Sequence, residues 1–80
     1  MAEKIIVYGT HWCHDTLRAR NCLGRLGIDY IWIDINEDEK ASDFVKKVNK
    51  GNRSVPTIVF PDGSILVEPS DEELEKKCKQ

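Results

Sequence analysis

Chemically active side chains gather in one short stretch, residues 10–16, where Cys13 stands next to Trp12. The apolar run before it, residues 5–8, is typical of a strand, and the apolar spacing after it is typical of a helix. We therefore expect Cys13 at or just before the first turn of that helix, where unpaired N–H groups and the helix dipole stabilise negative charge. A thiolate is favoured at such a place, and its pKa falls below the free value of about 8.5. Cys13 is the candidate nucleophile.

Two other interpretations of this stretch are open. Most lone cysteines are small buried hydrophobes, but Trp12 and the two histidines, His11 and His14, surround Cys13 without apolar neighbours. A zinc or copper site made of His11, Cys13 and His14 is the least favoured, because adjacent residues at a helix start point in different directions and a fourth ligand is missing. We therefore expect no metal site.

Length and composition indicate one small globular domain. The chain has 80 residues, of which 40% are hydrophobic and 32% charged, so we expect a single domain over residues 1–80. The net charge of −2 implies no general attraction to nucleic acid, and no apolar stretch approaches the ~20 residues of a membrane span. No signal peptide is visible, and three cysteines argue against a disulfide scaffold. We expect a cytoplasmic monomer.

The rest of the pattern predicts an α/β fold in the order β-α-β-α-β-β-α. The first two strands should pair in parallel across a helix, and Asp62-Gly63 indicates an antiparallel hairpin between the last two. Asn36 is the expected N-cap of the second helix, while Ser70 and Glu73 form a capping box for the third. The strands are expected over residues 4–8, 30–35, 55–60 and 65–67, and the helices over about 15–26, from Asn36 to Gly51, and from Ser70 onward.

This element order, with a cysteine at the first strand–helix junction and a proline opening the third strand, resembles the thioredoxin fold. Within that fold, a four-stranded mixed sheet flanked by three helices, the chain resembles the glutaredoxin family and most closely its mycoredoxin-like branch. The resemblance implies a thiol–disulfide oxidoreductase with a low-molecular-weight thiol, glutathione or mycothiol, as co-substrate, oxidised or thiolated proteins as partners, and no tightly bound cofactor. It is carried by Trp12-Cys13, residues 27–30, residues 48–57, residues 60–64 and Pro69-Ser70.

The resemblance also implies roles for residues far from Cys13 in the sequence. The bond before Pro56 should be cis, which would present the backbone of Val55 to a thiol ligand in the manner of an added strand. The start of the third helix should offer N–H groups to a ligand carboxylate. Arg53 either supplies positive charge to the place where the thiol ligand binds or is an ordinary surface arginine. The expected thiol-ligand site is Arg53, Ser54, Val55, Ser70 and Asp71, with Trp12, His14 and Pro56 in support.

The chain departs from the dithiol members of the family in one place. Where they have Cys-x-x-Cys, this chain has Cys13-His14-Asp15-Thr16, so no disulfide can form within the motif. Cys22 lies ~13.5 Å further along the helix and half a turn away in direction, beyond the ~7 Å that a disulfide allows. We expect Cys22 to pack in the core. Cys78 ends a helix whose start, not its end, approaches the site, so it is also an improbable partner.

Thr16 takes the place of the resolving cysteine and is expected to be catalytic. One turn after Cys13, its hydroxyl is placed to donate a hydrogen bond to the thiolate and lower its pKa. A protonated His14 would act in the same direction, and Asp15 in the opposite one.

We therefore predict a monothiol oxidoreductase of the glutaredoxin or mycoredoxin type that reduces mixed disulfides through Cys13. One alternative is a module that holds a [2Fe–2S] cluster between two protomers, although the residues after Cys13 are not the Gly-Phe-Ser of that branch. The other is a catalytically silent relative that only binds partners.

Overall fold

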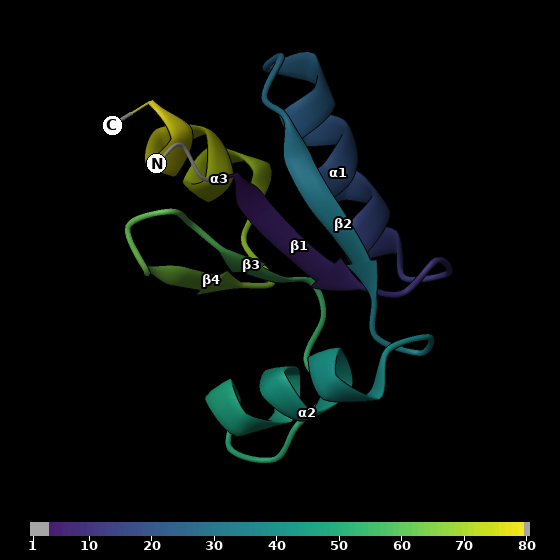
Figure 1. The fold of residues 1–80 in the computed structure, drawn as a ribbon. Coiled ribbons are helices and arrows are strands. Elements are labelled where there is room, and N and C mark those ends of the chain that lie inside the picture. Colours follow the sequence, from purple (N-terminus) through teal and green to yellow (C-terminus); the bar gives the residue numbers. More distant parts are fainter. Residues whose placement is uncertain (1–3, 80) are drawn as a thin grey trace.

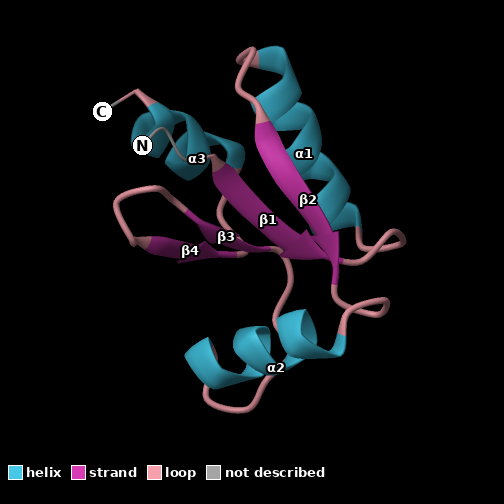
Figure 2. Ribbon diagram, viewed as in Figure 1, coloured by secondary structure: helices cyan, strands magenta, loops and turns pink. Residues whose placement is uncertain are grey.

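The computed structural model describes residues 4–79, and these fold in the predicted order (Figures 1 and 2). Within residues 4–79, none of the helices combines the length and the apolar character that a membrane span requires. The elements are β1 (Ile5–Gly9), α1 (His14–Arg25), β2 (Tyr30–Asp34), α2 (Glu39–Val48), β3 (Thr57–Val59), β4 (Ile65–Val67) and α3 (Asp71–Cys78).

The four strands form one mixed sheet in the order β2-β1-β3-β4. β1 pairs with β2 in parallel and with β3 in antiparallel fashion, and β3 and β4 form the predicted antiparallel hairpin. Tyr8 in β1 lies opposite Ile33 of β2 and Thr57 of β3. The C-terminal end of β1, which leads to Cys13, is therefore next to the segment that enters β3.

The two faces of the sheet are covered by different helices, because successive side chains of a strand point to opposite faces. Val7 belongs to a buried cluster with Leu23 of α1 and Leu74 of α3. Tyr8, the next residue, packs instead with a second cluster that includes Val45 of α2. Figure 1 shows the same division, with α1 and α3 side by side and α2 apart from them.

The start of α2 differs from the prediction, and the N-cap is Asp38 rather than Asn36. After β2 the chain first makes a turn in which the carboxylate of Asp34 accepts from the backbone N–H of Asn36 at 2.8 Å. The helix begins only after this turn, where Oδ1 of Asp38 accepts from the N–H of Ala41 at 3.0 Å. The prediction of Asn36 was wrong because the Asp34 turn competes with helix formation.

β3 is shorter than the predicted range of residues 55–60, because Val55 and Pro56 lie in the loop before it. Proline has no N–H to donate to a sheet, which limits the strand at that end. At the other end the N–H of Phe60 donates to the carbonyl oxygen of Ser64 at 2.9 Å and closes the hairpin. Gly63 takes a φ of +90° within that turn, a conformation that favours glycine.

Candidate active site

Cys13 is the N-cap residue of α1, which begins at His14, one residue earlier than predicted. Its backbone is extended, with φ −81° and ψ 119°, and its side chain makes no capping hydrogen bond. Its carbonyl oxygen accepts from the N–H of Leu17 at 3.0 Å, which fixes the first turn of the helix. The half-buried thiol therefore sits beside the positive end of the helix.

The backbone of Val55 lies beside this thiol. Sγ of Cys13 donates to the carbonyl oxygen of Val55 over 3.8 Å, across 42 residues of sequence. The Val55–Pro56 bond is cis, as the resemblance implied, and Pro56 is buried. The carbonyl of Pro56 accepts from the N–H of Glu68 at 2.8 Å, which ties this loop to the end of β4. The structure thus brings Cys13, Val55 and Pro56 together.

Thr16 is buried beneath the end of β1 and does not contact the sulfur through a hydrogen bond. Its side chain is 1% exposed, and within the described residues its Oγ1 has no hydrogen-bond partner. It packs against Gly9, where an added Cβ would lie 2.5 Å from Cγ2 of Thr16. The predicted hydrogen bond from Thr16 to Cys13 is therefore not formed, and the observed role of Thr16 is packing between α1 and β1.

The other residues of the motif face solvent. Trp12 is 71% exposed, and His14 and Leu17 are also exposed. Asp15 forms an ion pair with Arg18 one turn further along α1, with 2.9 Å between its Oδ1 and Nη1 of Arg18. Because the charge of Asp15 is compensated by Arg18, its unfavourable effect on a nearby thiolate is reduced.

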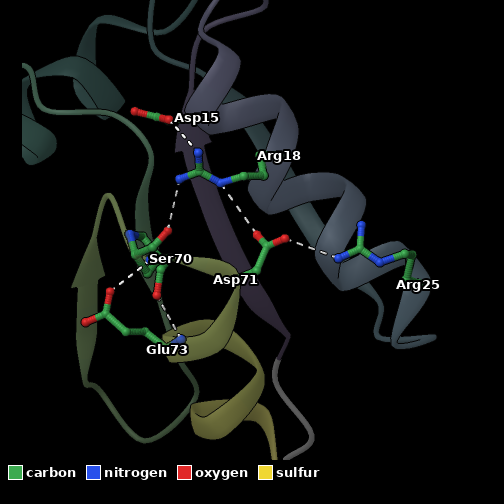
Figure 3. Close-up of polar contacts among 7 residues, drawn as sticks. Asp15, Arg18, Arg25, Ser70, Asp71 and Glu73 are labelled. Atoms are coloured by element: carbon green, nitrogen blue, oxygen red, sulfur yellow. Dashed lines mark hydrogen bonds and ion pairs between the residues drawn. The ribbon is translucent and has the colours of Figure 1, made fainter.

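Arg18 also joins α1 to the start of α3, as Figure 3 shows. Its Nη2 donates to the carbonyl oxygen of Pro69 at 3.5 Å, and its Nε lies 3.5 Å from Oδ1 of Asp71. The other oxygen of Asp71 accepts from Arg25, with 3.3 Å to Nη2. The carboxylate of Asp71, expected in the thiol-ligand site, is thus shared between two arginines of α1.

The predicted capping box at the start of α3 is confirmed (Figure 3). The N–H of Ser70 donates to Oε1 of Glu73 at 2.8 Å, and the N–H of Glu73 donates to Oγ of Ser70 at 3.1 Å. This leaves the amides of Asp71 and Glu72 without an intrahelical acceptor. However, the first turn carries three acidic side chains, which oppose the positive helix end, so this terminus is less suited to a ligand carboxylate than the resemblance implied.

Arg53 and Ser54 lie on the other side of the Val55 loop. The exposed guanidinium of Arg53 donates to Oδ1 of Asn36 at 2.7 Å and so holds the β2–α2 turn against the loop. The carbonyl oxygen of Ser54 accepts from Oγ1 of Thr57 at 2.7 Å. In this structure both residues support the backbone around Val55.

The remaining cysteines are held away from this chemistry. Cys22, on the buried face of α1, is fully buried in the core, and Cys78 packs half-buried against the same cluster. Burial raises the pKa of both thiols, and the nearby carboxylate of Asp71 raises that of Cys22 further. Because the thiolate is the reactive form, Cys22 and Cys78 are inert compared with an accessible thiol.

Among the described residues, the possible ligand atom of His11 lies close to those of Asp34 and Glu37. Nε2 of His11 lies 2.9 Å from Oδ2 of Asp34, at the end of β2, and its ring meets Trp32 edge-on with 5.7 Å between centroids. The buried carboxylate of Asp34 was missed from the sequence, where the only signal is an acidic residue among the apolar residues of a strand.

A thioredoxin-like sheet places a free thiol at the start of the first helix, beside a cis-proline loop, which is the arrangement of thiol–disulfide exchange proteins. A sequence model of the Glutaredoxin family matches residues 5–65. The chain belongs to the glutaredoxin family, whose members are in general thiol–disulfide oxidoreductases.

Individual relatives agree with this assignment. A Mycobacterium tuberculosis protein (strain H37Rv) that is provisionally named a glutaredoxin is 42% identical over 77 residues, covering 96% of this chain and 92% of that protein. Mycoredoxin 1 of Corynebacterium glutamicum is 39% identical over 78 residues, covering 96% and 95%. The crystal structure of a glutaredoxin from Archaeoglobus fulgidus has a TM-score of 0.78 and 26% identity, covering 96% of this chain and 87% of that one.

Proposed function

We propose that the protein is a monothiol oxidoreductase that reduces mixed disulfides between proteins and a low-molecular-weight thiol. The observation that carries the proposal is the placement of Cys13 at the helix start beside Val55, with Thr16 in the position of a resolving cysteine and Cys22 in the core.

The reaction needs one protein thiol and two molecules of the small thiol. The Cys13 thiolate attacks the sulfur of the small thiol in the mixed disulfide, and the protein substrate leaves as a thiolate that takes up a proton. A second small thiol, as its thiolate, then attacks the adduct, releases Cys13 and forms the disulfide of the small thiol. The electrons therefore come from the small thiol, and the loss of Cys-x-x-Cys is compatible with turnover.

Of glutathione and mycothiol, the charges around the site favour mycothiol. Glutathione carries two carboxylates, whereas mycothiol carries none. The start of α3 carries acidic side chains, and the nearby guanidinium of Arg18 is already paired with Asp15 and Asp71. A carboxylate ligand would have to displace one of these pairs, and an uncharged ligand would not. The 39% identity with a mycoredoxin supports the same choice.

The proposal is tested by intact mass after incubation with each oxidised thiol. We expect an adduct on Cys13 with both, formed faster with mycothiol disulfide than with glutathione disulfide. Asp71→Asn should raise the rate with glutathione and leave the rate with mycothiol unchanged, because it removes one negative charge from the start of α3. The matched control is Asp43→Asn, an exposed position on α2. If the wild type formed the adduct at equal rates with the two disulfides, and Asp71→Asn changed neither rate, the choice of mycothiol would be contradicted.

A further inference from the structure

We propose that His11, Asp34 and Glu37 form a binding site for a divalent transition metal such as zinc, beside the thiol site but separate from it. Each residue offers one ligand atom, and the three atoms lie within 4.8 Å of one another. Imidazole nitrogen and carboxylate oxygen are both common zinc ligands. The three come from two segments that the fold brings together, the loop after β1 and the end of β2 with its turn.

Asp34 is the fixed ligand of this group. Its side chain is 6% exposed, and its Oδ1 accepts from the N–H of Asn36 at 2.8 Å. Such a hydrogen bond to the second oxygen orients a ligating carboxylate. Oδ2 is left facing His11. A cation at that oxygen would stabilise the negative charge of this carboxylate, because burial reduces its hydration.

His11 is held with Nε2 toward that oxygen, 2.9 Å away. The edge of its ring packs on Trp32, and the guanidinium of Arg20 lies over the same indole, 4.1 Å from the ring centroid. Arg20 is fixed in turn by a 3.1 Å hydrogen bond from Nε to the hydroxyl of Tyr30. The imidazole is therefore oriented by packing, as a ligand must be, while more than half of its surface stays accessible to an incoming ion.

Glu37 supplies the third, adjustable ligand. Its backbone N–H donates to the carbonyl oxygen of Asp34 at 3.1 Å, which anchors its main chain, and its side chain is exposed. Zinc binds nitrogen and oxygen at about 2.0–2.2 Å, so its ligand atoms lie roughly 3–3.5 Å apart. The pair His11–Asp34 already has nearly this spacing, and the exposed carboxylate of Glu37 can rotate to complete it.

Binding would exchange one proton for the metal. Where Nε2 of His11 carries a proton, that proton leaves to solvent and the neutral ring nitrogen takes the ion, while both carboxylates bind as anions. Three protein ligands leave at least one coordination position for water. The ion would also fasten the loop before Cys13 to the end of β2. Cys13 itself is not part of the cluster, so the site does not depend on the proposed thiol chemistry.

The test is a calorimetric zinc titration of Cys13→Ser protein, which removes the accessible thiol as a competing ligand. We expect one zinc per chain. In this background Glu37→Gln should weaken binding about tenfold or more, since even the loss of a residue that only orients a ligand typically costs 10–100-fold. Two matched controls, Glu39→Gln on the first turn of α2 and His14→Asn at the start of α1, should leave the affinity unchanged. Both control residues are exposed.

Nitrogen NMR of the imidazole rings gives an independent readout in the same protein. Zinc should shift the Nε2 resonance of His11 and leave the ring of His14 unaffected. The proposal is overturned if zinc produces no saturable binding, if Glu37→Gln binds as the background does, or if Glu39→Gln weakens binding as much as Glu37→Gln.

Discussion

Sγ of Cys13 and the carbonyl oxygen of Val55 lie 3.8 Å apart, although 42 residues separate them in the sequence. The sheet register produces this contact. Tyr8 is paired with Thr57 across the antiparallel β1–β3 ladder. The segment that leaves β1 and the segment that enters β3 therefore lie at the same end of the sheet. The Cys13 thiol and the backbone beside it are thus positioned by β1, and changes at the end of this strand should alter the surroundings of the sulfur.

Gly9, the last residue of β1, provides the sharpest test of this dependence. An added Cβ would lie 2.5 Å from Cγ2 and 2.6 Å from Oγ1 of Thr16, which is buried and cannot move aside. Gly9→Ala should therefore lower the free energy of unfolding by about 1–3 kcal/mol and slow thiol exchange by displacing the start of α1. Urea denaturation and exchange kinetics measure the two effects.

The matched control is the same substitution at Gly24, on α1, where an added Cβ meets nothing within 4 Å. Gly24→Ala should raise the free energy of unfolding by about 0.5–1 kcal/mol, because alanine is the better helix former. Equal effects at the two glycines would show that the contact between Gly9 and Thr16 is not formed in solution.

Thr16→Val separates packing from chemistry at the position of the missing cysteine. Valine keeps the shape and removes a buried hydroxyl that has no partner within the described residues. Since an unsatisfied buried group costs about 1–3 kcal/mol, the variant should be as stable as the wild type or more so, with exchange kinetics unchanged. A tenfold loss of exchange rate, about 1.4 kcal/mol, would mean that the hydroxyl acts on the sulfur during the reaction.

Thr16→Cys should convert the site to the dithiol type. Residue 16 lies one helical turn after the N-cap residue Cys13, so both thiols would be at the helix start. We expect oxidation to remove two hydrogens from the intact mass and to leave no small-thiol adduct. Thr16→Ser is the control, because it has a similar size and cannot bridge. Persistence of the adduct in Thr16→Cys would show that the buried side chain at this position does not reach Sγ.

The burial of Cys22 and Cys78 predicts a selective and pH-dependent alkylation pattern. Burial raises the pKa of both thiols, and only the thiolate reacts, so at neutral pH iodoacetamide should label Cys13 alone. Labelling of the other two should rise only as the pH approaches their raised pKa values. Peptide mapping by mass spectrometry follows all three. Labelling of Cys22 at neutral pH, or a Cys13–Cys22 disulfide, would contradict the observed packing.

Local patterns in the sequence were enough to predict the order of the elements and the position of Cys13 at the start of α1. The apolar runs, the Asp62-Gly63 turn and the capping box at Ser70 are each encoded within a few residues, and each was confirmed. Alternating residues of β1 also account for the two buried clusters.

Contacts that depend on distant partners were not predictable in this way. Asp34 captures the N–H of Asn36 and the ring of His11, which moves the cap of α2 to Asp38. The side chain of Thr16 packs against Gly9, a residue seven positions earlier, and its hydroxyl makes no hydrogen bond to Cys13. In both cases tertiary contacts outweigh the preference of the local sequence.

The double variant Cys22→Ser, Cys78→Ser shows whether Cys13 alone carries the reaction. The measurement is the rate at which a peptide–mycothiol mixed disulfide is reduced with excess mycothiol as the electron donor. We predict the wild-type rate for the double variant and no activity above background for Cys13→Ser. Loss of activity in a double variant that stays folded by circular dichroism would contradict the monothiol mechanism.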